Sequence, residues 1–455
     1  MPKSLLLLFV VLFTWAACSP KKAQKNANAD IAIVPPPPVA PTLPTNKDPK
    51  AESTPVPPII IPKPAPTPTS TPSPKKSESP PKRDLTFMTG ADQIDRYLPL
   101  LQGQRVALVV NQTSTANGMH LVDALLSVGV DIHRVFAPEH GFRGDADAGE
   151  YVANARDKIT GLPIASLYGK NKKPSTTDLA DIDIVVFDIQ DVGARFYTYI
   201  STLHYIMEAC AENQKQCIVL DRPNPNGHYI DGPVLDPENR SFVGMHTIPL
   251  VHGLTVGELA QMINGERWLA NKQQCQLNVI PCIGYTHTFF YQIPVKPSPN
   301  LPNNRAIYLY PSLCLFEGTV ISVGRGTDKQ FQVIGAPGFD KMPYTFKPIP
   351  KPGAKTPPHQ NQTCRGLDLS NLSERELQQT RQIQLKWLLD FYKASPDKAH
   401  FFLENNFFNQ LAGNKTLKQQ IIAGKSEDEI RKTWQPALKT YKNMRKKYLL
   451  YTDFE

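Results

Sequence analysis

Short apolar runs alternate with amphipathic segments along the chain from about residue 105 to residue 220. The runs at 105–110, 132–137, 183–189 and 217–220 are mostly apolar, and each ends in a polar segment that contains glycine, proline or asparagine. Between them, residues 120–128 and 200–213 carry apolar side chains at the spacing of one helix face. Apolar strands that alternate with helices are typical of a parallel sheet covered on both faces. The pattern therefore predicts an α/β fold with a Rossmann-like, doubly wound and mostly parallel sheet.

Beyond residue 300 the pattern changes to shorter apolar runs. A short strand is predicted at 315–321, followed by a glycine-punctuated loop at 323–328. Residues 373–394 and 426–447 have the periodicity of helices, and the second segment carries one apolar face made of Ile430, Trp434, Leu438 and Tyr441. A stripe of this kind is far more often part of a core than a ligand surface. We therefore expect a smaller α+β domain at 301–455, packed beside a first domain at 84–300.

The first 83 residues predict export and a membrane anchor. Residues 1–18 consist of a basic start, an apolar run from Leu5 to Phe13, and Ala17 followed by Cys18. The run is too short to span a bilayer and is typical of a signal peptide. Small residues directly before a cysteine are typical of a lipoprotein, so we expect lipidation of Cys18, with simple secretion as the alternative. Residues 19–83 are rich in proline, lysine and serine and predict a disordered tether. The expected location is the cell envelope, in the periplasm or at the outer membrane.

Composition argues against several classes of function. The formal net charge is +9, but the lysines gather in the tether and the last helix without interleaved aromatic residues, so no nucleic-acid partner is expected. The cysteine spacings fit no zinc pattern. No GxGxxG or Walker A motif is present, and no G-x-S-x-G elbow, which disfavours nucleotide cofactors and an esterase of the α/β-hydrolase type. We expect neither a metal nor a cofactor.

Polar side chains follow each of the four predicted strands. The carboxyl ends of parallel strands share one edge of the sheet, and doubly wound folds bind ligands there. Tyrosine rings suit the face of a sugar, and amide groups suit hydroxyl and acetamido groups. The candidate binding residues on these loops are Asn111, Ser114, Arg143, Gln190, Arg195, Tyr197, Tyr199, Asn224 and Asn226, and the candidate acid and base are Glu139 and His140.

Several of these loops carry a family resemblance. Residues 137–144 (APEHGFRG), 187–199 (FDIQDVGARFYTY), 220–225 (LDRPNP) and 322–327 (SVGRGT) resemble the exo-β-N-acetylmuramidase family, glycoside hydrolase family 171, also catalogued as domain of unknown function 1343. Gln330 and Phe339 depart from the family pattern, which has Pro and Trp there. The resemblance implies release of N-acetylmuramic acid from the non-reducing ends of peptidoglycan fragments without metal or cofactor. It also implies a Rossmann-like catalytic domain and an auxiliary C-terminal domain that borders the cleft.

The resemblance also implies roles for individual residues. Glycoside hydrolysis usually uses two carboxyl groups around the scissile bond. Glu139 is expected to donate the proton to the leaving oxygen, and His140 either orients it or has a structural role. The second carboxyl group remains open among Asp188, Asp191, Asp145 and Glu150.

One further expectation concerns recognition of the muramic lactyl group, whose carboxylate needs a fixed cation. Arg325, between two glycines, is the first candidate, and Arg143 and Arg195 compete with it. The alternative for Arg325 is an interdomain salt bridge. Two other functions stay open at this point: a non-catalytic wall-binding lipoprotein, and an amidase or esterase that acts on muropeptides.

Overall fold

The computed structural model describes residues 87–139, 141–142, 155–169 and 171–455. The predicted signal peptide and tether lie outside the described residues, as do Cys18, His140, Arg143, Asp145 and Glu150. Every described residue belongs to one compact unit, Pro80–Glu455. Within this part of the chain, no helix is long and apolar enough to cross a membrane.

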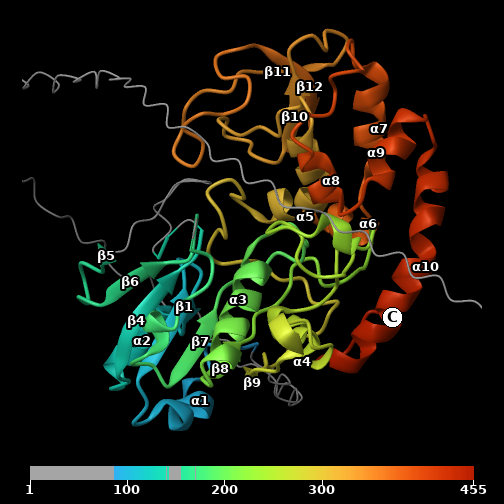
Figure 1. Ribbon diagram of the computed structural model, residues 1–455. Helices are drawn as coiled ribbons and strands as arrows, with labels where there is room; N and C mark the ends of the chain where they lie inside the picture. Colours follow the sequence, from blue (N-terminus) through green and yellow to red (C-terminus); the bar gives the residue numbers. More distant parts are fainter. Residues whose placement is uncertain (1–86, 140, 143–154, 170) are drawn as a thin grey trace, which may run out of the picture. The chain divides into compact units, whose positions relative to one another are not determined.

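The centre of the unit is a seven-stranded sheet in the order β5-β6-β4-β1-β7-β8-β9 (Figure 1). All neighbouring strands are parallel except β5 and β6. The chain extends the sheet outward from β1 in one direction and then returns to β7 on its other side, so the topological switch point lies between β1 and β7. The predicted α/β fold is confirmed. The strands are β1 Val106–Val110, β4 Ile132–Ala137, β5 Ala155–Arg156, β6 Pro163–Ser166, β7 Ile184–Asp188, β8 Gln216–Leu220 and β9 Gln276–Ile280.

Alternate side chains of the central strands enter two separate cores. Val106, Leu108 and Val110 pack with helices α1 (Ile94–Leu101) and α2 (Leu121–Ser127). Ala107 and Val109 face the opposite side, where α3 (Tyr199–Glu212) and α4 (Val256–Gly265) cover the sheet. This alternation follows from the two-residue period of a strand. It explains why the strands are apolar at nearly every position.

The C-terminal part adds a small antiparallel sheet in the order β10-β12-β11 and six α-helices. Its core is continuous with the core on the α3 and α4 face and includes Phe316, Phe391 and Trp434. The elements are α5 Asn304–Leu313, β10 Val333–Ala336, β11 Tyr344–Phe346, β12 Cys364–Asp368, α6 Glu374–Thr380, α7 Leu385–Ala394, α8 Phe407–Ala412, α9 Thr416–Ile422 and α10 Glu427–Arg445. A small hairpin, β2 Thr115–Ala116 and β3 Met119–His120, and four short 3₁₀ helices, Thr177–Leu179, Pro237–Asn239, Ala270–Lys272 and Lys446–Tyr448, complete the unit.

Helix α10 begins at a capping box in which Ser426 and Glu429 satisfy each other's backbone N–H groups. Its stripe of Ile430, Trp434, Leu438 and Tyr441 is buried, as the helical spacing predicts. The segment 373–394 also folds as helix, but as two helices, because Arg381 takes a left-handed conformation (φ 50°) that ends α6.

The prediction of a strand at 315–321 is wrong. Residues Cys314–Gly318 form a 3₁₀ helix, η4, that continues α5, and Thr319 makes only an isolated bridge to Phe402. A short apolar run cannot be assigned to strand or buried helix from periodicity alone. Gly318 packs against the backbone of Phe408 so closely that a Cβ atom there would lie 2.5 Å from the Phe408 Cα. This contact joins η4 to α8, and η4 becomes one wall of the pocket described below.

Candidate active site

Glu139 reaches a pocket because the strand before it, β4, ends two residues earlier. β4 ends at Ala137, and Pro138 cannot continue the hydrogen-bonded ladder. Gly141 closes a turn with a positive φ of 78°, and its N–H donates to the Pro138 carbonyl at 3.1 Å. The Glu139 side chain thereby lines a pocket of about 200 Å³. The pocket lies beyond the carboxyl ends of the strands, where the α/β topology predicts a ligand.

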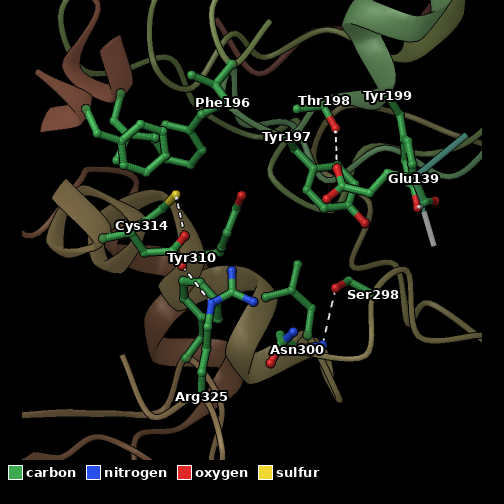
Figure 2. A pocket seen from close by; sticks show the side chains of 16 residues that line it. Glu139, Phe196, Tyr197, Thr198, Tyr199, Ser298, Asn300, Tyr310, Cys314 and Arg325 are labelled. Atoms are coloured by element: carbon green, nitrogen blue, oxygen red, sulfur yellow. Dashed lines mark hydrogen bonds and ion pairs between the residues drawn. The ribbon is translucent and has the colours of Figure 1, made fainter. Parts of the chain in front are cut away.

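Thr198 fixes one oxygen of this carboxyl group. Its hydroxyl donates to Oε2 of Glu139 at 3.0 Å (Figure 2). Thr198 is the N-cap residue of α3 and makes no side-chain capping bond to the helix, so its hydroxyl is available for this contact. The N-terminus of a helix also favours a nearby negative charge. One Glu139 oxygen is therefore held by Thr198.

Two tyrosines form the wall next to Glu139. The Tyr197 and Tyr199 rings pack edge to face with centroids 4.9 Å apart. The Tyr197 hydroxyl donates to the Pro297 carbonyl at 2.8 Å, and the Tyr199 hydroxyl lies 3.3 Å from the backbone carbonyl of Glu139. Burial, together with the charge of Glu139, raises the pKa of Tyr199. Burial, the charge of Glu139 and a side-chain hydrogen bond with Glu139 raise the pKa of Tyr168 to about 12. These phenols stay protonated and act as hydrogen-bond donors.

The opposite wall comes from the C-terminal part of the chain. α5 contributes Tyr310, η4 contributes Cys314 and Glu317, and the glycine-punctuated loop contributes Arg325. The Arg325 Nε donates to Oε1 of Glu317 at 2.7 Å, and the guanidinium lies over the Phe331 ring at 5.2 Å. Burial tends to lower the pKa of Arg325, but the charge of Glu317 outweighs it, so this pKa is raised. Figure 2 shows the Arg325 and Glu139 side chains entering the pocket from opposite sides.

A third segment, just before α5, closes the pocket between these walls. Ser298 and Asn300 line it, and the Asn300 amide donates to the Gly353 carbonyl at 2.8 Å. The Pro297 carbonyl in the same segment accepts from Tyr197. The lining residues that were not predicted from the sequence include Thr198, Ser298, Asn300, Tyr310 and Glu317. Of these residues, only Thr198 could have been predicted, because it lies between Tyr197 and Tyr199 on a strand-end loop. The others lie outside the strand-end loops.

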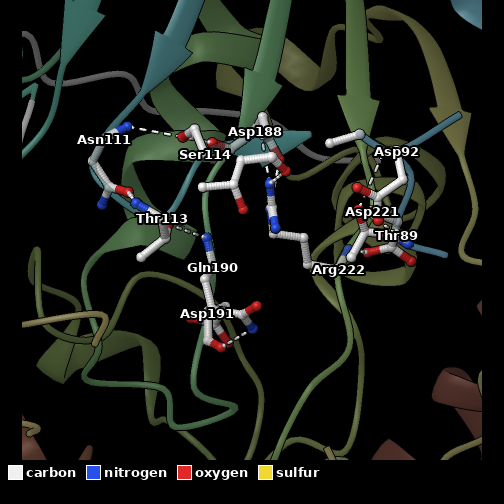
Figure 3. A network of polar contacts seen from close by, with 12 residues as sticks. Thr89, Asp92, Asn111, Thr113, Ser114, Asp188, Gln190, Asp191, Asp221 and Arg222 are labelled. Atoms are coloured by element: carbon white, nitrogen blue, oxygen red, sulfur yellow. Dashed lines mark hydrogen bonds and ion pairs between the residues drawn. The ribbon is translucent and has the colours of Figure 1, made fainter. Parts of the chain in front are cut away.

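The rim at the topological switch point is filled by the chain's own side chains (Figure 3). The Ser114 hydroxyl accepts from the Asn111 N–H, and the Asn111 amide oxygen accepts from the Thr113 hydroxyl at 2.6 Å. Arg222 binds Asp188 through two hydrogen bonds of 2.6 and 2.8 Å, and both side chains are buried. Three predicted site residues on this rim therefore have partners within the fold: Asn111, Ser114 and Asp188.

Five further predicted site residues also have partners within the fold, and none of them is among the residues that line the pocket. Gln190 donates to the carbonyls of Asp191 and Pro223, and Asp191 accepts from the Gly193 N–H. Arg195 is fully buried and donates to the carbonyls of Pro233, Ile248 and Leu411. Asn224 and Asn226 donate to the carbonyls of Leu254 and Val192. Polar side chains at strand ends here organise the loops that carry the pocket residues.

Comparison with known proteins decides the family. A family model described as exo-β-N-acetylmuramidase NamZ, N-terminal, matches residues 106–305, and the C-terminal model of the same family matches residues 308–451. The chain belongs to the NamZ family. The resemblance found in the sequence is confirmed. Glu139, Thr198 and Asn300 fall in the N-terminal match, whereas Tyr310 and Arg325 fall in the C-terminal match. The pocket is thus built by both halves of a NamZ-family chain.

Individual relatives agree with this assignment. The peptidoglycan β-N-acetylmuramidase NamZ of Bacillus subtilis (strain 168) is 39% identical over 384 residues, which cover 80% of this chain and 91% of that protein. A crystal structure of a DUF1343 family protein from Bacteroides fragilis NCTC 9343 is 47% identical with a TM-score of 0.75, covering 81% of this chain and 99% of that one. A second such structure from the same organism is 32% identical with a TM-score of 0.68, covering 81% and 100%.

Three buried thiols form a cluster apart from the pocket of this NamZ-family protein. The sulfur atoms of Cys210, Cys217 and Cys275 lie within 4.8 Å of one another, in the core between α3 and the sheet. Within the described residues, these are the side chains placed closely enough to share a metal ion, and none of them lines the pocket. They come from α3, from β8 and from the segment just before β9, so their spacing in the sequence gave no sign of the cluster. Within the described residues, the polar groups that line the pocket are carboxyl, hydroxyl, amide and guanidinium groups and the Cys314 thiol.

Proposed function

We propose that this protein is an exo-acting glycoside hydrolase that releases N-acetylmuramic acid from the non-reducing ends of peptidoglycan fragments. Membership of the NamZ family and the name of the Bacillus subtilis relative support the activity and the substrate class. The form of the pocket supports exo action. A cavity of about 200 Å³ with walls from three segments suits one terminal sugar better than an internal unit of a chain.

The observation that carries the proposal is the position of Glu139. A general acid must present one carboxyl oxygen to the leaving group of the substrate. Thr198 donates to Oε2 of Glu139 at 3.0 Å, which fixes how this carboxyl group lies in the wall of the pocket. Tyr197, Tyr199 and Tyr310 give the pocket aromatic walls against which a sugar ring can pack. Glu139 then donates its proton to the glycosidic oxygen as the bond to the anomeric carbon breaks.

The geometry leaves the second carboxyl group of the reaction unassigned. Asp188 is paired with Arg222 inside the fold, and Asp191 is buried against the Gly193 N–H. Asp145 and Glu150 lie outside the described residues. Glu317 lines the pocket, but its Oε1 is bound by Arg325. Its Oε2 accepts from the Cys314 thiol, so both oxygens have partners and we assign Glu317 a different task below.

An amidase or esterase that acts through a cysteine is disfavoured by the state of Cys314. Burial, together with the charge of Glu317, raises the pKa of this thiol well above its usual value. The Cys314 sulfur donates to Oε2 of Glu317 at 3.5 Å. A nucleophilic cysteine needs the opposite environment, in which a cation or an imidazole favours the thiolate.

The direct test is to incubate the protein with a disaccharide that carries N-acetylmuramic acid at its non-reducing end. The proposal predicts free N-acetylmuramic acid and a shortened fragment. Binding of the disaccharide without release of sugar would instead indicate a wall-binding lipoprotein. Release of stem peptide from a muropeptide, with the glycan intact, would indicate an amidase.

We further propose that the protein is anchored in the cell envelope by a lipid on Cys18, in the periplasm or at the outer membrane. The support is the apolar run that ends in Ala17 and Cys18, followed by the proline-rich segment 19–83. A single acyl chain binds membranes only marginally, so stable anchoring needs more than one chain. Lipidation of a lipobox cysteine supplies them. A proline-rich tether of this length would let the catalytic unit reach peptidoglycan away from the membrane.

A further inference from the structure

Arg325 is held in the pocket by the backbone around it. Gly324 and Gly326 both have positive φ angles, 80° and 78°. A Cβ atom on Gly324 would lie 2.7 Å from the Lys329 carbonyl oxygen, and one on Gly326 would lie 2.6 Å from the Ile349 carbonyl oxygen. Only glycine tolerates both the conformation and the close approach. The loop therefore fixes the point from which the Arg325 side chain enters the pocket.

Glu317 fixes the orientation of the guanidinium. Its Oε1 accepts from Nε of Arg325 at 2.7 Å, and its Oε2 accepts from the Cys314 thiol at 3.5 Å. The Phe331 ring supports the guanidinium plane at 5.2 Å. Contacts on two sides leave the guanidinium little freedom to rotate, and Figure 2 shows its terminal nitrogens pointing into the pocket.

The guanidinium then has one edge free for a ligand. A guanidinium can bind carboxylates along two edges, one that includes Nε and one formed by the two terminal nitrogens. Across the described residues, the hydrogen bond of Arg325 uses Nε alone. The terminal edge can accept a planar anion through two parallel hydrogen bonds, which lysine could not do.

The negative charge of Glu317 does not cancel this attraction. Coulomb energies fall inversely with distance. A carboxylate on the terminal edge lies about 4 Å from the guanidinium centre and roughly twice as far from Glu317, so the attraction is about twice the repulsion. Glu317 therefore weakens the attraction between Arg325 and a bound carboxylate, but it also orients the guanidinium that provides this attraction.

We propose that Glu317 is a positioning residue that sets the Arg325 guanidinium to bind a carboxylate-bearing sugar and reject the neutral one. This inference rests on the proposed function, because the carboxylate is the lactyl group of N-acetylmuramic acid. Glu317 acts through Arg325 and does not itself exchange a proton with the substrate. Selectivity for the acidic sugar is thus a property of the pair, and either residue alone is insufficient.

The test compares dissociation constants for two ligands, N-acetylmuramic acid and its lactyl methyl ester, in which one added methyl group removes the negative charge. A charge-assisted pair predicts that the wild type binds the acid about 10- to 150-fold more tightly than the ester. Glu317→Ala should reduce this preference to a few-fold, as should Arg325→Ala. Glu317→Gln, whose amide oxygen can still accept from Nε, should keep most of it. The double variant Glu317→Ala/Arg325→Ala should be no less selective than Arg325→Ala alone.

Glu266→Gln is the matched control, because Glu266 is another partly exposed glutamate in an ion pair, with Lys447, and does not line the pocket. It should leave the preference unchanged. Thermal unfolding of each variant identifies any that fails to fold. If an alanine variant does not fold, Glu317→Gln and Arg325→Lys replace it. Glu317→Gln should keep the preference for the acid, and Arg325→Lys should lose it. An undiminished preference for the acid in Glu317→Ala would overturn the inference. So would an equal loss of affinity for acid and ester.

The same measurements separate this inference from the proposed function. Release of N-acetylmuramic acid by a wild type that binds acid and ester equally well would overturn the inference and leave the proposed function standing. A strong preference for the acid without any release of sugar would leave the inference standing and overturn the proposed function.

Discussion

The hydroxyl of Thr198 donates a hydrogen bond of 3.0 Å to Oε2 of Glu139. Glu139 follows β4 and Thr198 precedes α3, so the contact joins the loops that follow two different parallel strands, β4 and β7. Since the carboxyl ends of these strands share one edge of the sheet, residues 59 positions apart meet there. The bond restrains rotation of the carboxyl group, and Glu139 lines the pocket.

Thr198→Val tests this contact, because valine keeps the shape of threonine but cannot donate. A hydrogen bond to a charged group contributes about 1.5–3 kcal/mol, roughly 10- to 150-fold in rate. We expect a loss of that order in kcat/KM on the muramic disaccharide. Stability should change little, because the hydroxyl does not cap α3. Thr198→Ser keeps the hydroxyl and should retain activity, whereas full activity of the valine variant would show that the contact is unimportant.

Asp188 is expected to stabilise the fold without taking part in the chemistry. Its carboxylate is fully buried and receives two hydrogen bonds from Arg222. Removing one partner of a buried ion pair costs about 3–5 kcal/mol, since it leaves an uncompensated charge. Asp188→Asn should therefore lower the free energy of unfolding measured in urea by that amount. The double variant Asp188→Leu/Arg222→Met should be less destabilised than the single one. Unchanged stability with lost activity would return Asp188 to the list of catalytic candidates.

Much of the fold follows from the sequence because each central strand faces a core on both sides. The observed strands Val106–Val110 and Ile132–Ala137 match the apolar runs to within one residue. The failure at 315–321 has a local cause: the run is short, and tertiary contact with α8 holds it as a 3₁₀ helix. A run of that length carries too little periodicity to predict its own conformation.

Fewer of the pocket residues than of the strands could be predicted from the sequence. The strand-end rule places Glu139, Tyr197 and Tyr199 at the correct edge, and all three line the pocket. The same rule selects Arg195 and Asn224, which are buried and bound to backbone carbonyls. Position at a strand end gives the edge of the sheet but not the direction of the side chain. The opposite wall comes from Tyr310, Glu317 and Arg325, at least 111 positions beyond Tyr199 in the sequence, and only packing brings them there.

Asp221 should make stability depend on pH. Burial raises the pKa of this carboxyl group to about 6, although hydrogen bonds from Tyr451 and Thr255 oppose the shift. The folded state thus holds the proton more tightly than the unfolded chain, so the stabilisation is complete below about pH 4 and is lost as the pH rises through about 6. The shift from 3.8 to about 6 corresponds to roughly 3 kcal/mol. Unfolding free energies of the wild type should fall over this range relative to those of Asp221→Asn. Parallel curves for the two proteins would contradict the assignment.

Cys18 should determine where the protein resides. With Cys18→Ala, no lipid can be attached, so the protein should move from the membrane fraction to the soluble periplasmic or secreted fraction. Mass spectrometry of the wild-type N-terminus should find the acyl chains on Cys18. Membrane association that persists in the variant, with no acyl mass on the wild type, would exclude the lipid anchor.

The central claim is that Glu139 donates the proton to the leaving group, and leaving-group dependence tests it most directly. Glu139→Gln removes the proton and keeps the shape, and general acid catalysis typically contributes 10²–10⁴-fold. Two substrates should be compared: the muramic disaccharide, whose sugar leaving group needs protonation, and an aryl β-N-acetylmuraminide with an acidic phenol, which departs without it. The account predicts a fall of that size in kcat/KM on the disaccharide and a much smaller fall on the aryl substrate. Equal losses on both, or activity within a few-fold of wild type on the disaccharide, would contradict it.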